Sequence, residues 1–270
     1  MTGKSDFRTQ INGRPATVED LSSLAFAGFA HFTAMQVRKG AVRGLDLHLS
    51  RLRSASDEFF GQALPDAVVR ERLRSAIDAG TSALSLTATM FSSNGEFTST
   101  GAKDDPAILV RTAPPSDGPE GPLRLAIVQH ERPFPTIKHV GEASKTHYLR
   151  QAVKEGYDDA AFIDTHGHMS EATIWNLAFW DGEAVVWPKA ALLAGVTMQI
   201  VRRRLDALGI AQREEPIGLA RAIEMKGAAV MNSWTPGVPV SALGSISVPL
   251  SPTFIEILRA AYEREPLVEI

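Results

Sequence analysis

The chain has 270 residues, a formal net charge of −3 and a hydrophobic content of 44%, which are ordinary values for a soluble globular protein. The mild acidity argues against a nucleic-acid surface, and the absence of cysteine excludes disulfides, thiolate metal sites and a cysteine nucleophile. The polar start MTGKSDFRTQ lacks the apolar core of a signal peptide, and no apolar run approaches transmembrane length. We therefore expect a cytoplasmic protein with neither a nucleic-acid nor a membrane partner.

The first part of the chain, residues 1–113, is predicted to form a small α+β domain. An Asn-Gly pair favours a tight hairpin turn, and apolar residues at helical spacing favour two helices. In chain order, we expect a hairpin at 8–18, strands within 31–42, helices at 45–60 and 66–80, and strands near 83–91 and 107–112.

A run rich in Pro and Gly, APPSDGPEGP, carries no apolar period and predicts a linker at 114–121. The remainder, 122–270, is predicted to be a larger, strand-rich α+β domain. In chain order, we expect a strand at 123–129, a helix at 144–156, strands at 160–163, within 169–182 and at 183–187, a helix at 196–209, a strand at 227–233 and a helix near 252–262.

The stretch MSEATIWNLAFWDG, residues 169–182, places a carboxylate within apparently buried β-structure. Burying an unpaired acid is expensive, so Glu171 should have a cationic or protonated partner. That partner could be a nearby arginine or backbone N–H, which would make the residue structural, or it could belong to a ligand.

Metal and nucleotide motifs give little signal. The closest histidine pair, His166 and His168, lies in a predicted turn without a patterned carboxylate, so we predict no metal site. The chain also lacks HExxH, a Walker lysine loop, GxGxxG and GxSxG.

The entry to the predicted helix at 196–209 could bind an anion. A glycine and a threonine stand in AGVTMQIVRRRL, where the exposed N–H groups and the macrodipole of a helix start favour a phosphate. An ordinary N-cap explains the same pattern. Arg51, three residues after His48 on a predicted helix, and Ser233, at the end of a strand, are unremarkable when each is taken alone.

Taken together, these blocks resemble the fold-type IV pyridoxal phosphate enzymes, the class IV aminotransferase family. That family includes branched-chain and D-amino-acid aminotransferases and aminodeoxychorismate lyase. The matching blocks are HFTAMQVRKGAVRGLDLHLSRL, PTIKH, SEATIWNLAF, LLAGVTMQIVRRRLDALGI and VMNSWTPGVPV, in the family's order over nearly the whole chain. The resemblance implies a two-domain α+β fold and pyridoxal 5′-phosphate as cofactor.

The resemblance also assigns roles to residues. Glu171 would bond the pyridine nitrogen of the cofactor and keep it protonated, with Asn176 supporting the hairpin behind it. The phosphate would be held by Arg51, Val196, Thr197 and Ser233. The Schiff-base lysine would be Lys138.

Two lysines compete for that last role. Lys138 follows the apolar Ile137 at a predicted strand mouth and lies 33 positions before Glu171, close to the interval of the family. Lys145 lies within a predicted helix, where an exposed lysine is common. On this spacing, Lys138 is the predicted catalytic residue.

The cofactor-binding blocks match the family better than the substrate-binding ones. Gly28-Phe29-Ala30 stands where members often have Gly-Asp-Gly, and Phe32-Thr33 where Phe-Glu often follows, a variation that resembles some lyases. Met198 replaces a frequent arginine, and residues 87–97 lack the arginine with which some members grip a carboxylate.

We therefore expect an aminotransferase that moves an amino group between an amino acid or amine and an oxo acid, acting as a homodimer. A lyase of the aminodeoxychorismate type is the first alternative, because it would use the same cofactor. A non-catalytic member that serves as a binding module is the second.

Overall fold

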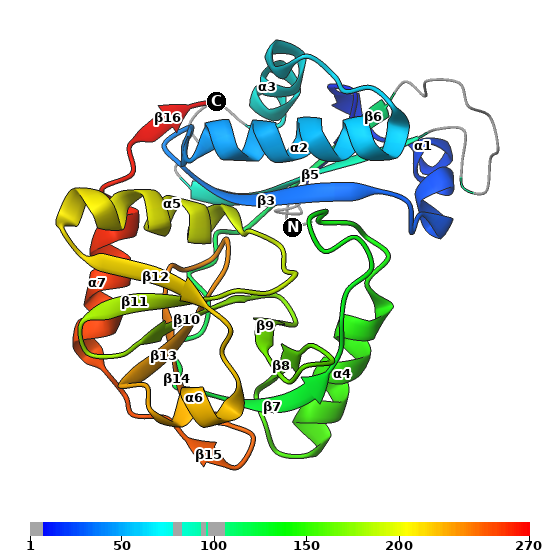
Figure 1. The fold of residues 1–270 in the computed structure, drawn as a ribbon. Helices are drawn as coiled ribbons and strands as arrows, with labels where there is room; N and C mark the ends of the chain where they lie inside the picture. The colour runs from blue at the N-terminus through cyan, green and yellow to red at the C-terminus, as the bar shows by residue number, and fades with distance from the viewer. Residues whose placement is uncertain (1–7, 78–82, 93–95, 97–105) are drawn as a thin grey trace, which may run out of the picture. The chain divides into compact units, whose positions relative to one another are not determined.

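The computed structural model describes residues 8–77, 83–92, 96 and 106–270, and the chain divides into two units (Figure 1). Unit 1 takes the described residues up to Ser116 together with Ile137–Glu142 and Leu267–Ile270. Unit 2 consists of Asp117–Thr136 and Ala143–Pro266. The first crossing from unit 1 to unit 2 thus falls within the predicted linker.

Unit 1 is built on one sheet. Its described elements are β1 (Arg8–Ile11), β2 (Arg14–Pro15), α1 (Val18–Ser22), the 3-10 turn η1 (Ser23–Phe26), β3 (His31–Arg38), β4 (Ala41–Arg43), α2 (Leu45–Phe60), α3 (Asp66–Ser75), β5 (Ala83–Ser92), β6 (Pro106–Ala113) and β16 (Leu267–Glu269). Among the described residues, seven strands run in the order β16-β4-β3-β5-β6-β1-β2.

The core of unit 1 follows from two periodicities. Alternate residues of β3 are buried, as expected for a strand with one face on the core, and α2 packs on β3 and β5 (Figure 1). The buried stripe of α2 includes Leu45, Leu49 and Leu52, and the helix ends at Phe60 with Gly61 as its C-cap, whose φ of +70° suits glycine.

Two later segments return to unit 1. Ile137–Glu142 runs beside the start of β3, where Phe32 N–H donates to Lys138 O at 2.8 Å and Val140 N–H donates to Ala30 O at 2.7 Å. The last strand, β16, pairs antiparallel with β4. These backbone bonds explain why both segments group with residues far away in sequence.

Unit 2 carries the second sheet. Its elements are β7 (Leu123–Gln129), α4 (Ala143–Lys154), β8 (Asp159–Ile163), β9 (Met169–Ala172), β10 (Asn176–Trp180), β11 (Ala184–Pro188), α5 (Val196–Leu205), the 3-10 turn η2 (Asp206–Leu208), β12 (Ala211–Glu215), α6 (Leu219–Ile223), β13 (Gly227–Met231), β14 (Val238–Leu243), β15 (Ile246–Ser247) and α7 (Pro252–Glu263). Among the described residues this sheet has nine strands, with the path β12-β11-β10-β13-β14-β7-β8-β9 and β15 beside β14.

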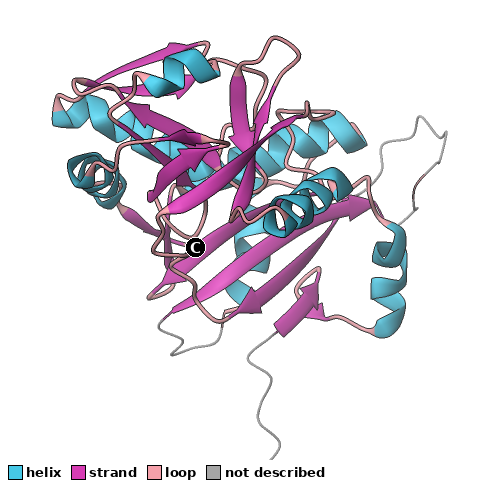
Figure 2. Ribbon diagram, turned by 90° about the horizontal axis from the view of Figure 1, so that it is seen from below, coloured by secondary structure: helices cyan, strands magenta, loops and turns pink. Residues whose placement is uncertain are grey.

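Alternation along β10 separates two cores in unit 2. Leu177 and Phe179 join one buried cluster, whereas Ala178 joins another that is covered by α5 and α7. Figure 2 shows the strands with helices packed against them. β9 also pairs with β10, and these two strands carry the predicted site residues Glu171 and Asn176.

The structure confirms the predicted α+β class and most of the expected elements. The helix expected at 66–80 is α3, and residues 78–80 lie outside the described part of the chain, as do 93–95 and 97 of the stretch that lacks an arginine. In the described residues, no helix is long and apolar enough to cross a membrane, and no cluster of three potential metal-ligating side chains occurs.

Candidate functional site

The candidate site in unit 2 centres on the buried carboxylate of Glu171, on β9. Its Oε1 lies 3.2 Å from Arg132 Nη1 and 3.4 Å from Lys145 Nζ. The side chains of Glu171, Arg132 and Lys145 are 5%, 3% and 13% exposed, respectively. The carboxylate therefore has the cationic partners that its burial requires.

Lys145 lies in the first turn of α4, and the neighbouring chain supports that turn. His130 Nε2 lies 3.1 Å from Ser144 Oγ, and the His130 ring packs on Tyr148, one turn later in the helix. His130 thus contacts α4 at residues before and after Lys145 in the sequence. Its helical context suggested an exposed lysine, but the Lys145 side chain is only 13% exposed and does not point into solvent.

Arg132 is a site residue that the sequence reading missed. It lies in the segment ERPFP between β7 and α4, and its guanidinium also donates to Pro135 O at 3.1 Å. A proline-rich turn has no period from which burial can be inferred. The signal that pointed toward it was the expectation that Glu171 needs a positive partner.

Asn176 connects Glu171 to the start of α5. The two residues are directly opposite in the antiparallel pair β9–β10. The Asn176 side chain donates from Nδ2 to Leu193 O at 2.7 Å and accepts at Oδ1 from Gly195 N at 3.1 Å. Because one amide bonds both groups, Asn176 fixes the chain that enters α5 relative to the hairpin that carries Glu171.

The start of α5 has the properties of an anion site. Gly195 is its N-cap and provides no side-chain cap, so the N–H groups of the first turn, at Val196 and Thr197, have no acceptor within the helix. A Cβ at Gly195 would lie 2.0 Å from Asn176 Oδ1, so only glycine fits there. Thr197 Oγ1 donates to Asn232 O at 2.7 Å, so Asn232, the residue before the predicted Ser233, lies beside this turn.

Arg51 lies in unit 1, on α2, one turn after His48. The buried His48 ring contacts Thr33, with Nδ1 and Oγ1 2.6 Å apart. Burial lowers the pKa of His48 to about 3, and the positive charge of Arg51 adds to the effect. The guanidinium of Arg51 is thus close enough to act electrostatically on a neutral, buried histidine.

Lys138, the lysine that the spacing favoured, also lies in unit 1. It belongs to the segment that runs beside β3, and its Nζ lies 4.8 Å from the centroid of the Phe32 ring, a cation–π contact. Glu171 and its two cations lie in unit 2. The structure therefore pairs Glu171 with Lys145 and pairs Lys138 with an aromatic ring.

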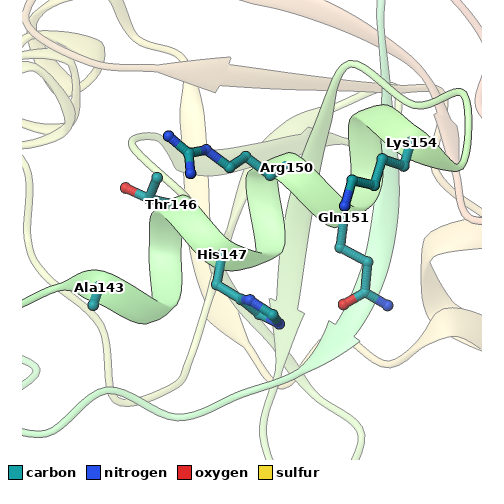
Figure 3. A pocket seen from close by; sticks show the side chains of 6 residues that line it. All are labelled: Ala143, Thr146, His147, Arg150, Gln151 and Lys154. Carbon is teal, nitrogen blue, oxygen red and sulfur yellow. The ribbon is translucent and has the colours of Figure 1, made fainter.

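A surface pocket of about 720 Å³ runs along α4 and is separate from these contacts. In Figure 3, Thr146 and Arg150 extend from one side of the helix, and His147 and Gln151 from the other. Ala143 and Lys154 complete its lining, which contains none of the site residues described above.

Comparison with known proteins identifies the family. The sequence model described as amino-transferase class IV matches residues 30–243, which is most of the chain. The protein therefore belongs to the class IV aminotransferase family, whose members use pyridoxal phosphate. A search of curated proteins finds no match to this chain.

Solved structures show the same fold. A branched-chain aminotransferase of Thermoproteus uzoniensis, with norvaline, is 18% identical over 97% of this chain and 98% of its own, with a TM-score of 0.81. A branched-chain aminotransferase of Escherichia coli is 18% identical over 97% of this chain and 95% of its own, with a TM-score of 0.80. A Legionella pneumophila protein described as a 4-amino-4-deoxychorismate lyase is 19% identical over 93% of this chain and 96% of its own, with a TM-score of 0.77.

These similarities confirm the α+β fold of the fold-type IV aminotransferases that the sequence predicted. A further branched-chain aminotransferase among the neighbours was solved with pyridoxamine 5′-phosphate. At 18–19% identity the similarities carry no assignment of substrate or reaction. Both aminotransferases and a lyase-like protein occur among the neighbours.

Proposed function

We propose that the protein is a pyridoxal phosphate-dependent aminotransferase that moves an amino group between an amino acid or amine and an oxo acid. The observation that carries this proposal is the buried Glu171 carboxylate on β9, which lies opposite Asn176, whose side chain accepts from Gly195 N at 3.1 Å at the start of α5. A carboxylate held out of solvent is the group that the ring nitrogen of this cofactor needs, and the N–H groups of a helix start suit its phosphate.

The residues of unit 2 fit the cofactor. Glu171 offers a carboxylate to a protonated pyridine nitrogen, and the α5 start offers N–H groups to a phosphate. Asn176 joins these two features through its bond to Gly195, and the clash that a Cβ at Gly195 would make shows how closely they are packed. When bound, pyridoxal phosphate supplies an electron sink for the carbanion formed at the substrate Cα.

We assign the covalent cofactor link to Lys138, which the 33-residue interval to Glu171 and the resemblance to the family support. The ring carbon that bears the aldehyde lies opposite the ring nitrogen, so the ring would separate the covalently bound lysine from the carboxylate at the nitrogen. Lys145 Nζ lies 3.4 Å from Glu171 Oε1, which suits a second cation that stabilises the buried carboxylate. Lys138→Ala should abolish the bound cofactor's absorbance band, and Lys145→Ala should retain it.

Each remaining residue would bind or orient. Glu171 would hold a proton on the ring nitrogen, and Arg132 would hold the Glu171 carboxylate in place by its 3.2 Å contact. Once released by the amino substrate, the Lys138 amine would act as the base that removes the substrate Cα proton. Val196, Thr197 and Ser233 would hold the phosphate in unit 2, and the resemblance to the family supports Arg51 as a further phosphate ligand.

The lyase alternative remains the second candidate, because the L. pneumophila lyase-like protein shares the fold and Phe32-Thr33 departs from the more frequent Phe-Glu pair. Both reactions would use the same cofactor groups. A homodimer and a cytoplasmic location, inferred from the resemblance and the composition, belong to the same proposal.

Half-reaction spectroscopy tests the proposal against both alternatives. The cofactor-loaded protein is mixed with single amino donors, D- and L-amino acids and simple amines, without any oxo acid. An aminotransferase converts the bound cofactor to its aminated form and stops there, so the original band disappears once per site. Release of pyruvate from an aminodeoxychorismate-like substrate without that conversion would favour the lyase. A protein that takes up no cofactor would favour the non-catalytic binding module.

A further inference from the structure

A tryptophan beside the proposed phosphate turn is exposed and has no role in the mechanism above. Trp234 directly follows Ser233, and 39% of its surface is exposed. Its indole packs edge-to-face on Trp175, with ring centroids 5.8 Å apart and an interplanar angle of 79°. Ile174, the neighbour of Trp175, is also an exposed apolar residue. An exposed indole offers a large, rigid apolar area that can contact a ligand.

The indole that supports Trp234 is itself anchored. Trp175 is buried, and its Nε1–H donates to Asp159 Oδ2 at 2.9 Å. The buried Asp159 also accepts from Thr173 Oγ1 at 2.6 Å. Asp159 therefore hydrogen-bonds two residues of the connection between Glu171 and Asn176, Thr173 and Trp175, and fixes the ring against which Trp234 packs.

The backbone around Trp234 is also constrained. Its N–H donates to Asn232 Oδ1 at 2.8 Å, and Asn232 N–H donates to Thr235 O at 3.1 Å. Gly118 packs against this turn, so that a Cβ there would lie 3.1 Å from Thr235 Cγ2 and 3.4 Å from Trp234 Cβ. Because the Trp234 N–H already has an acceptor, the residue is available to a ligand through its side chain.

We propose that Trp234 is a specificity-determining residue that contacts the substrate and selects amino compounds with an apolar or aromatic side chain. The inference rests on the proposed function. In pyridoxal phosphate, the ring carbons that bear the reactive aldehyde and the phosphate arm are neighbours. A side chain adjacent to the phosphate-binding Ser233 is therefore within reach of the substrate.

An indole face favours this substrate class because it offers a large apolar area and a ring for offset or edge contacts. The network behind it makes the contact pre-organised, since little side-chain freedom remains to be lost when a ligand binds. Trp175 and Asp159 are positioning residues, because they act on the substrate only through Trp234.

Selectivity kinetics test the contact. The ratio of kcat/KM for phenylalanine to that for alanine, each of the productive hand, should fall about tenfold in Trp234→Ala, the scale of a lost apolar contact. Trp234→Phe should retain most of the ratio because it keeps a ring. Trp180→Phe is the matched control, since Trp180 stacks on Phe254, remote from Ser233 in sequence, and its ratio should equal that of the wild type.

The positioning role requires a separate comparison. Trp175→Ala removes the ring that supports Trp234 and should raise KM for phenylalanine more than it lowers kcat, whereas Trp175→Phe restores a supporting ring and should rescue KM. Equal loss of kcat toward phenylalanine and alanine in both variants would indicate general damage to the fold and would overturn the positioning role.

Binding without turnover gives an independent measurement. In cofactor-loaded protein, 3-phenylpropionate, which has no amino group to react, should protect tryptophan fluorescence from acrylamide, and propionate should not. The protection should disappear in Trp234→Phe and persist in Trp180→Phe. Protection that follows protein concentration in place of ligand would mean that a second copy covers Trp234, and this would overturn the proposal.

The outcomes separate the two levels of inference. If the wild type binds cofactor and transfers amino groups but Trp234→Ala leaves the selectivity ratio unchanged, this inference alone fails. If the wild type takes up no pyridoxal phosphate, the proposed function fails and this inference fails with it.

Discussion

Replacing Glu171 by Gln isolates the electrostatic role of the buried carboxylate. The change keeps the size of the side chain and an acceptor oxygen, but it removes the negative charge that faces Arg132 at 3.2 Å and Lys145 at 3.4 Å. Removing one partner of a buried ion pair costs about 3–5 kcal/mol. Since the amide oxygen can still accept a hydrogen bond, we expect the free energy of unfolding to fall by about 3 kcal/mol.

The assay is urea unfolding of the cofactor-free protein followed by tryptophan fluorescence. All four tryptophans lie in the sequence ranges of unit 2, so the signal reports the unit that contains Glu171. The matched control is Glu214→Gln, which breaks a contact of 3.0 Å to Arg202 between side chains that are 41% and 40% exposed. An exposed pair contributes at most about 1 kcal/mol.

An equal loss of stability in the two variants would refute the reasoning, because it would mean that Glu171 is not held as a buried counter-ion. In the cofactor-loaded protein, Glu171→Gln should still bind pyridoxal phosphate but lose most turnover, since a neutral amide stabilises a protonated ring nitrogen poorly. Near-normal turnover would remove Glu171 from the mechanism.

Three further predictions concern the cofactor cradle and the buried histidine. Gly195→Ala should weaken pyridoxal phosphate binding by about tenfold or more in an absorbance titration, because its Cβ would displace the Asn176 amide. The control is Gly218→Ala at the N-cap of α6, where the nearest atom to an added Cβ is 3.6 Å away; this variant should bind the cofactor normally. Arg51→Ala should raise the dissociation constant of the cofactor, and an unchanged value would mean that Arg51 does not bind the phosphate. The control is Arg53→Ala, which breaks an exposed pair with Asp66 and should leave the dissociation constant unchanged. Burial lowers the pKa of His48 to about 3, so the unfolded state binds a proton first on acidification, and stability should fall between pH 6.5 and 3 by about 1.4 kcal/mol per pH unit for this histidine. His48→Gln should make that slope shallower in urea unfolding followed by circular dichroism, and an identical slope would contradict the assignment.

Local patterns predicted the parts of the site that one element or one hairpin determines. Glu171 and Asn176 lie on the two short strands of one hairpin, β9 and β10, and the structure places them directly opposite each other. The start of α5 at Val196 follows from a glycine before a helical period. In each case the information lies within about ten residues.

Local sequence patterns could not predict the direction of side chains or the pairing of distant segments. Lys145 was read as an exposed helix lysine, but its side chain is largely buried because α4 begins beside Glu171. Arg132 lies in a turn without a period. β16 consists of three exposed residues, and only its backbone pairing with β4 makes it a strand.

The identity of the lysine that carries the cofactor tests the central claim most directly. Borohydride reduction of the cofactor-loaded protein, followed by proteolysis and mass spectrometry of the peptides, locates the covalent pyridoxyl group. The account predicts that the group is on Lys138, which lies 33 positions before Glu171. A pyridoxyl group on Lys145, whose Nζ lies 3.4 Å from Glu171 Oε1, would contradict the assignment of Glu171 to the opposite end of the ring. The absence of the group from both lysines would contradict the proposed function itself.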